Sequence, residues 1–171
     1  MIFIVVSGQR KTGETAMKFK NPLLVVTDLE RSKQFYREIL GLRVIQDFGA
    51  NVTLTGGICL QTLDSWQGFL GVEPNDIRFG GRAAELYFEE DDFDGFLAKL
   101  ESYPEISYVH PPLEHRWGQR VVRLYDPDGH IIEVGENIKT VCRRFLDSGM
   151  TVEETAQRMD VPEKFIRACM R

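Results

Sequence analysis

Four polar side chains stand at matching places in two similar halves of the chain, and side chains of this kind can hold a cation or a polar ligand. They are Asn21 and Gln61 in the first half and Glu85 and Glu133 in the second. Glu133 lies in the middle of the apolar run "HIIEVGE". Because a buried carboxylate without a partner is costly, we expect Glu133 to be ion-paired, protonated or bound to a cation.

An internal repeat predicts the elements that position these residues. Asn21–Leu29 ("NPLLVVTDL") and Glu85–Phe93 ("ELYFEEDDF") each predict a strand and then an acid at a helix start. Asp28 and Asp92 suit the N-cap position, where a carboxylate accepts hydrogen bonds from free backbone N–H groups. Each half therefore predicts the order β-α-β-β-β and an α+β fold. The strands expected after the two helices are Val44–Phe48, Asn51–Thr55, Ile58–Leu63, Ile106–His110, Arg120–Tyr125 and His130–Val134.

A tight turn in the second half predicts the neighbours of Glu133. Asp126–Gly129 ("DPDG") has the composition of a type I turn. If the first and last residues of this turn pair, Glu133 lies opposite Val122, and Arg120 lies diagonal to it on the same face. Arg120 is therefore the expected ion-pair partner of Glu133, as the alternative to a bound cation.

The first half contains an equivalent hairpin. The two glycines between Thr55 and Ile58 predict a two-residue primed turn. With Thr55 paired to Ile58, Gln61 is expected opposite Val52.

A loop rich in polar and aromatic residues precedes the second hairpin. In "HPPLEHRWGQR", Trp117 would stack on a ligand, Arg120 would bind an anionic group, Glu114 would add a carboxylate, and His110 or His115 could carry a proton near neutral pH. The alternative is an ordinary loop with an anchoring tryptophan.

The segment between the halves could also either contact a ligand or be an ordinary anchored loop. Asp64–Arg82 is long, polar and glycine-rich, which predicts a loop at the rim of a site. Trp66 within it would contact a ligand or anchor the loop.

Composition excludes several classes of protein. The 171 residues carry a net charge of −5, which argues against nucleic acid and anionic membranes as partners. No apolar run reaches the length of a membrane span. The three cysteines are far apart, which favours free thiols and the cytoplasm. We expect residues 1–16 to be an extension, with a domain over residues 17–136.

These motifs resemble the vicinal oxygen chelate superfamily, which includes glyoxalase I, bleomycin-resistance proteins, fosfomycin-resistance enzymes and extradiol dioxygenases. The resemblance covers about Met17 to Glu136 and rests on "VVTDLERSKQFYREILGL" and "RLYDPDGHIIEV". It implies paired βαβββ modules that form a cupped mixed sheet around a ligand cavity. It also implies a homodimer.

The resemblance also implies where a metal ion would bind. Carried over by position, the ligands would be Gln61, Glu85 and Glu133, whereas Asn21 is a poor match. Metal sites of the family usually contain histidine, and none of the chain's histidines falls at these positions. An oxygen-only set suits Mg²⁺ or Mn²⁺ better than Zn²⁺, and Ni²⁺ is a further candidate.

Residues 137–171 predict a helical appendage. The expected helices are Ile138–Leu146, Val152–Met159 and Glu163–Met170, and Thr151 with Glu154 forms a capping box. "TVEETAQRMDVPEKFIR" looks somewhat like a helix-turn-helix. From Ile138 onward there are seven Lys/Arg and five Asp/Glu, which is too weakly basic to favour DNA over a packing role.

Three functions follow from these patterns. The first is a metal-assisted lyase, isomerase or hydrolase of a small oxygenated substrate, with Glu133 at its catalytic centre. The second is a binding protein that sequesters a flat or aromatic molecule between Trp66, Tyr87 and Trp117, and the missing histidines favour it. The third is a ligand-sensing DNA-binding regulator. The residues leave open whether the chain is an enzyme.

Overall fold

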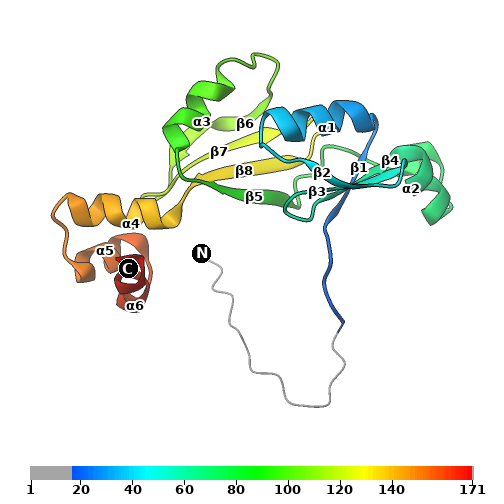
Figure 1. Ribbon diagram of the computed structural model, residues 1–171. Coiled ribbons are helices and arrows are strands. Elements are labelled where there is room, and N and C mark those ends of the chain that lie inside the picture. The colour runs from blue at the N-terminus through cyan, green and yellow to red at the C-terminus, as the bar shows by residue number, and fades with distance from the viewer. Residues whose placement is uncertain (1–16, 171) are drawn as a thin grey trace.

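Two four-stranded mixed sheets form the centre of the molecule. The computed structural model describes residues 17–170, so the expected extension over residues 1–16 lies outside the described residues. Figure 1 shows the sheets side by side, with α1 and α3 on one face, α2 at one end and α4–α6 at the other. This arrangement confirms the α+β fold of paired modules.

The first module has the strand order β1-β4-β3-β2, in which β1 runs parallel to β4 and the other pairs are antiparallel. Its elements are β1 (Leu23–Val26), α1 (Leu29–Glu38), β2 (Val44–Asp47), β3 (Asn51–Leu54) and β4 (Cys59–Thr62), followed by α2 (Leu63–Leu70) and a 3₁₀ helix (Pro74–Asp76).

The second module repeats this pattern with the strand order β5-β8-β7-β6. Its elements are β5 (Glu85–Glu90), α3 (Phe93–Leu100), β6 (Tyr108–Glu114), β7 (Arg120–Tyr125) and β8 (Ile131–Glu136). The C-terminal helices are α4 (Ile138–Asp147), α5 (Val152–Met159) and α6 (Glu163–Cys169).

The two module helices begin where the sequence predicts. Asp28 accepts a hydrogen bond from the backbone N–H of Arg31, and Asp92 accepts one from Gly95, each at 3.0 Å. These carboxylates satisfy N–H groups that have no partner inside a helix, so they stabilise the first turns of α1 and α3.

One hydrophobic core joins both modules. It lies between the sheets and the helices α1 and α3, and its burial from water is the main stabilising term of the fold. Its fully buried members include Val26, Tyr36, Leu60, Leu124 and Ile132. The opposite face of the two sheets, which α1 and α3 leave uncovered, is called the open face below.

Both hairpins are closed by three residues rather than two, which corrects the expected register. In the second hairpin Asp126 N–H donates to His130 O at 3.0 Å, and Gly129 adopts the left-handed region with φ +84°. A turn followed by a left-handed glycine adds one residue to the loop. Glu133 therefore pairs with Arg123, not with Val122.

The first hairpin shows the same shift. Leu54 N–H donates to Ile58 O at 2.8 Å, across a loop that contains two left-handed glycines. Gln61 consequently pairs with Asn51 rather than with Val52. A shift of one residue moves every side chain of the partner strand to the other face.

The first part of the segment after β4 forms helix α2, which corrects the loop that the sequence predicts over Asp64–Arg82. Leu63, Trp66 and Leu70 recur at helical spacing, and Gly71 ends α2 in the left-handed conformation with φ 66°. Gly71 therefore marks the end of a helix.

The turn of the second hairpin also holds the two modules together. Asp128 accepts hydrogen bonds from Thr27 N–H and from the hydroxyls of Thr27 and Ser32, and it pairs with Arg31 at 3.2 Å. Asp126 accepts the hydroxyl of Tyr36 at 2.9 Å. The acids of the turn therefore dock on the first turns of α1, a role that the sequence did not indicate.

The C-terminal helices have a core of their own. Their bounds match the sequence prediction to within one residue, and the Thr151 capping box is present as predicted. The core contains Val141, Cys142, Met159 and Ile166, all fully buried. Among the described residues, none of the helices is both long and apolar enough to cross a bilayer.

Candidate functional site

The open face of the second sheet carries the polar residues that the sequence singles out. Glu85 and Tyr87 on β5 align with Ile131 and Glu133 on β8 in parallel register, so all four side chains share this face. Glu133 is only 6% exposed, whereas Tyr87 is 49% exposed. The face thus combines a buried carboxylate with an accessible aromatic ring.

Arg123 of β7 binds two carboxylates of this face, those of Glu85 and Glu133. Its Nε donates to Glu85 Oε2 at 2.9 Å, and its Nη2 forms an ion pair with Glu133 Oε2. The sequence placed Arg120 beside Glu133, which is wrong because of the register shift. The ion pair with Arg123 places a positive charge beside the buried Glu133 carboxylate without a metal ion.

Two histidines border the Arg123 cluster. His110 Nε2 lies 3.3 Å from Arg123 Nη1, and His110 Nδ1 lies 2.8 Å from Pro111 O. Burial, and then the positive charge of Arg123, lower the pKa of His115. The lowered pKa favours the neutral form of His115.

Tyr87 is fixed at the edge of the site by a buried glutamine. Gln119 Nε2 donates to the Tyr87 hydroxyl and to Glu136 O, each at 2.9 Å, and the Tyr87 hydroxyl donates to Glu89 Oε1 at 3.2 Å. Burial, together with the charge of Glu89, raises the pKa of Tyr87 to about 12, against the opposing effect of Gln119. The side chain of Tyr87 is thus uncharged, and its hydrogen bonds fix the orientation of its ring.

Arg120 lies on the other face of the sheet, under α3. Its guanidinium pairs with Asp94 at 2.7 Å and with the buried Glu136 at 3.1 Å, and it stacks over Phe93. The hydrogen bond from Arg120, and then its charge, lower the pKa of Asp94. Both carboxylates neutralise Arg120, so this geometry does not favour the expected role of binding an anionic ligand.

The first part of the predicted rim loop, up to Glu114, belongs to β6, and the remainder is anchored rather than free. Trp117 stacks on His115 with ring centroids 4.2 Å apart and donates from Nε1 to Gln119 Oε1 at 3.1 Å. Glu114 pairs with Arg158 of α5 at 3.4 Å. The loop therefore connects the open face to the C-terminal helices.

Gln61 and Trp66 belong to the first module and do not join this cluster. Gln61 is 3% exposed, accepts from Asn51 Nδ2 at 2.7 Å and donates to the Ser65 hydroxyl. Trp66 is half-buried on α2, which packs against β1 and β4 at the end of the molecule opposite α4 (Figure 1). Within one chain, Trp66 therefore does not face Trp117.

The residues expected to hold a metal ion do not fit that role. Arg123 already binds the carboxylates of Glu85 and Glu133, and the Gln61 amide is satisfied within the other sheet. No group of three or more His, Cys, Asp or Glu within residues 17–170 is arranged to hold a metal. Asn21 is also engaged, because its Nδ2 donates to Gly57 O.

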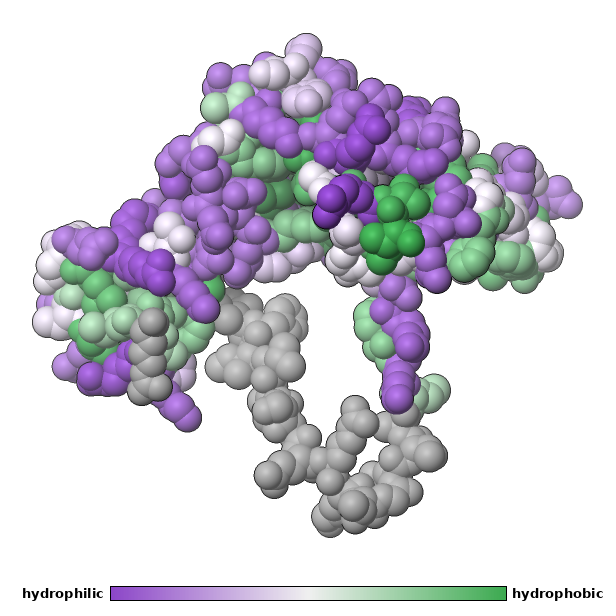
Figure 2. Space-filling view, in the orientation of Figure 1, coloured by the Kyte–Doolittle hydropathy of each residue, from purple (hydrophilic) through white to green (hydrophobic). Residues whose placement is uncertain are grey.

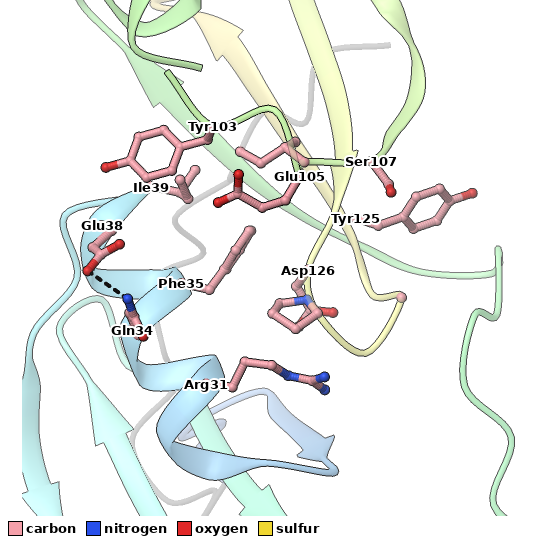
Figure 3. A pocket seen from close by; sticks show the side chains of 13 residues that line it. Arg31, Gln34, Phe35, Glu38, Ile39, Tyr103, Glu105, Ser107, Tyr125 and Asp126 are labelled. Carbon is pink, nitrogen blue, oxygen red and sulfur yellow. Dashed lines mark hydrogen bonds between the residues drawn. The ribbon is translucent and has the colours of Figure 1, made fainter. Parts of the chain in front are cut away.

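A cavity of about 670 Å³ lies on the helix-bearing side, at the junction of the modules. Figure 3 shows Phe35 of α1 and Ile39, which directly follows the helix, on one side of it, with Tyr103 and Glu105 across from them. Asp126 of the docking turn also lines it. The cavity is thus part of the junction and lies apart from the open face.

Arg123 and Gln119 are the important residues that sequence reasoning missed. The signal for Arg123 was present in the turn "DPDGH". A three-residue loop ending in a left-handed Gly129 places Arg123 directly opposite Glu133. Gln119 had no comparable signal, because its partners Tyr87 and Glu136 come from other strands.

The chain has clear relatives among protein families and solved structures. A family model described as a glyoxalase-like domain matches residues 19–139. A protein of unknown function from Agrobacterium tumefaciens is 37% identical, with a TM-score of 0.63 over 72% of this chain and 97% of the other. No curated protein matches the chain.

Two more distant structures share the fold. A glyoxalase/bleomycin resistance protein/dioxygenase from Nocardioides is 21% identical, with a TM-score of 0.59 over 73% of this chain and 86% of the other. A glyoxalase-related enzyme from Fulvimarina pelagi is also 21% identical, with a TM-score of 0.58 over 72% and 90%. At this identity the similarity establishes the fold alone.

Proposed function

Because the chain belongs to the glyoxalase-like domain family of the vicinal oxygen chelate superfamily, we propose that it binds a small aromatic molecule that carries a positive charge. The binding surface is the open face of the second sheet around Tyr87. The protein would sequester this ligand without transforming it.

The charge balance around Tyr87 is the observation that carries this proposal. Glu85, Glu89 and Glu133 bring three carboxylates to the open face, and Arg123 neutralises part of their charge. The exposed ring of Tyr87 lies among them. An acidic surface with an accessible aromatic ring favours organic cations, which gain both ionic and cation–π attraction.

The enzymatic alternative is a metal-assisted lyase or isomerase with Glu133 at the catalytic centre. It requires a divalent ion on Gln61, Glu85 and Glu133. The existing contacts of these side chains with Arg123, Asn51 and Ser65 favour the binding protein over the enzyme.

We further propose a packing role for residues 137–171, as a separate unit, rather than DNA binding. Several of its cations are engaged, since Arg144 pairs with Glu136, Arg158 with Glu114, and Arg167 with Glu163. DNA binding needs clustered cations that are free to contact phosphates.

We also propose that the protein works in a reducing compartment such as the cytoplasm, as a homodimer. Cys142 and Cys169 are free thiols buried in the same C-terminal core, which agrees with a reducing compartment. The dimer proposal rests on an exposed apolar patch on β2 and the turn after it (Figure 2). Its residues are Val44, Ile45 and Phe48, which are 39%, 60% and 70% exposed.

The test uses ethidium as an aromatic monocation and anilinonaphthalene sulfonate as an aromatic anion. Titration followed by fluorescence should show that the wild-type protein binds the cation in preference to the anion. Tyr87→Ala and Glu85→Gln should each weaken ethidium binding by roughly fivefold, because each removes about 1 kcal/mol of cation–π or ionic attraction.

Trp66→Phe is the matched control, because α2 lies outside the proposed surface, and it should bind ethidium as the wild type does. Equal affinity for the anion, or unchanged ethidium binding in both site variants, would contradict the proposal.

A further inference from the structure

We propose that the cavity at the junction of the two modules binds a primary alkylamine, which is a compact ammonium group on a short apolar chain. This cavity lies on the helix-bearing side of the sheets, and Glu85, Tyr87 and Glu133 of the open face do not line it. The proposal is therefore independent of the function proposed for the open face.

The size and the walls of this cavity are the first observation that carries the proposal. Its volume of about 670 Å³ lies in the range of small-molecule sites, whereas voids between packed elements are seldom larger than a water molecule. One wall is a helical stripe from Arg31 to Ile39. The facing wall comes from the other module, from residues 103–107 and the docking turn. The two modules thus border a space that neither of them fills.

The apolar part of the lining suits an alkyl chain. Ile39 is buried, and Phe35, Tyr103 and Ile106 are half-buried. Figure 3 shows Phe35 and Ile39 together on the α1 side of the cavity. Each methylene group that leaves water for such a surface strengthens binding about fourfold.

Two of the four charged side chains in the lining are already satisfied within the protein. Arg31 forms an ion pair with the buried Asp128 at 3.2 Å. The carboxylate of Asp126 accepts four hydrogen bonds inside the junction. These contacts neutralise the charge of Arg31 and satisfy Asp126, so neither side chain determines the charge of the ligand.

The other two charged side chains, Glu38 and Glu105, favour a cation. Figure 3 shows the Glu105 carboxylate pointing toward α1, and no ion pair within residues 17–170 involves it. Glu38 on α1 pairs with Arg37 at 3.4 Å, but the Arg37 side chain is 66% exposed, and water weakens such a pair. An ammonium group is a compact charge with three N–H donors, which matches carboxylates that face a cavity from two walls.

The experiment titrates n-hexylamine, which is an ammonium ion at neutral pH, into the isotope-labelled full chain and follows the backbone amide signals by NMR. The signals of residues 31–39, 103–107 and 125–129 should shift. Hexanoate, the matched anion, should shift none of them. Butylamine is two methylene groups shorter and should bind about tenfold more weakly.

Two site variants and a matched control make the result specific. Glu105→Gln and Glu38→Gln should each weaken hexylamine binding about fivefold, because each removes one ionic contact near the surface. Glu38 and Glu105 lie outside the hydrophobic core, so both variants should fold. Glu101→Gln makes the same change at the end of α3, outside the cavity, and should bind hexylamine as the wild type does.

Several outcomes would overturn the proposal. Shifts centred on residues 85–89 and 131–135 would place the amine on the open face instead. Equal affinity for hexanoate, or unchanged affinity for hexylamine in both site variants, would show that the two carboxylates do not select the ligand. No shift at millimolar hexylamine would show that the cavity does not bind the amine. None of these results depends on ethidium binding, so this proposal and the proposed function can fail separately.

Discussion

The buried carboxylate of Asp126 accepts four hydrogen bonds within the junction of the two modules. Its carboxylate accepts bonds from the backbone N–H of Asp128, from the Nδ1 and the backbone N–H of His130, and from the hydroxyl of Tyr36. Burial alone would raise the pKa of Asp126, but the hydrogen bonds and charge of His130 and the bond from Tyr36 leave it below its ordinary value. Burial and the charge of Asp126 in turn raise the pKa of Tyr36.

Stability should therefore fall in acid through Asp126. A depressed folded pKa contributes stability above the unfolded value of 3.8, and this contribution is lost as pH falls through the folded value. Asp126→Asn should cost about 2 kcal/mol at pH 7, the usual worth of hydrogen bonds to a charged group. Urea unfolding at several pH values should show that the difference in unfolding free energy between the wild type and Asp126→Asn becomes smaller below pH 3.8.

Asp64→Asn is the control, because Asp64 is exposed on α2, and its unfolding free energy should follow the wild type at every pH. If the unfolding free energies of Asp126→Asn and the wild type differed by the same amount down to strongly acidic pH, the charge of Asp126 would not be the source of the stability.

The candidate site was partly predictable at the level of single residues. Glu85 and Glu133 were expected on one face, and they lie there because strand alternation is a local property. Their partner Arg123 was missed because the hairpin register depends on the conformation of Gly129. An error of one residue in the hairpin register made Arg120, instead of Arg123, the predicted partner of Glu133.

At the scale of elements, helix α4 is attached to the loop that supports Tyr87. Arg144 donates to Gly118 O at 2.6 Å and to Glu136 at 3.0 Å, and the ring of Phe145 packs on Gly118. A Cβ atom on Gly118 would lie 2.2 Å from this ring, so only glycine allows the contact. The next residue, Gln119, carries the bond to the Tyr87 hydroxyl.

Removing the Arg144 side chain should destabilise both α4 and the loop that it contacts. We expect Arg144→Ala to increase amide hydrogen exchange in α4 and in residues 115–119, because two charge-assisted bonds are lost at their junction. Exchange in α1 and α3 should stay unchanged. Mass spectrometry of peptides after exchange measures all four segments.

The neighbouring Arg143 provides the control for this prediction, since it is exposed on the same helix. Arg143→Ala should exchange as the wild type does. An increase confined to α4, without any change in residues 115–119, would contradict the proposed connection.

Helices and strands were predicted better than their connections. The caps of α1, α3 and α5 carry local signals, and all three were placed correctly. Helix α2 was missed because its glycines suggested a loop, although Gly71 in fact ends a helix. Local chemistry identifies an element most reliably where a capping side chain marks its start.

At the scale of the whole molecule, β2 has a strand edge and an apolar surface that the rest of residues 17–170 leaves uncovered. All four residues of β2 are exposed, and β2 is the last strand of its sheet. Such edges invite pairing with another chain unless they are protected. The patch of Val44, Ile45 and Phe48 is therefore the expected centre of the proposed homodimer.

A charge within this patch should separate the dimer. Sedimentation velocity should give a dimer for the wild type and a monomer for Ile45→Lys, because burying the lysine charge would cost far more than the apolar contact provides. Phe69→Lys, on the exposed side of α2, should remain a dimer. A wild-type monomer at all concentrations would refute the dimer.

The repeat of two modules was evident from the sequence, but their junction was not. Asp128 and Thr27 are 101 residues apart, and no local pattern indicates that they meet. The turn "DPDG" carries a strong signal for its own conformation. That signal says nothing about the helix on which its acids dock.

This separation has a consequence for synthesis on the ribosome. When the first module emerges, Thr27 and Ser32 have no Asp128 to bond, because that residue is added about 100 residues later. While the second module is made, the start of α1 therefore lacks the hydrogen bonds that Asp128 provides in the folded protein. Contacts of such long range form slowly, and their exposed precursors are targets for chaperones. Translation speed across residues 85–130 should thus influence how much protein reaches the native state.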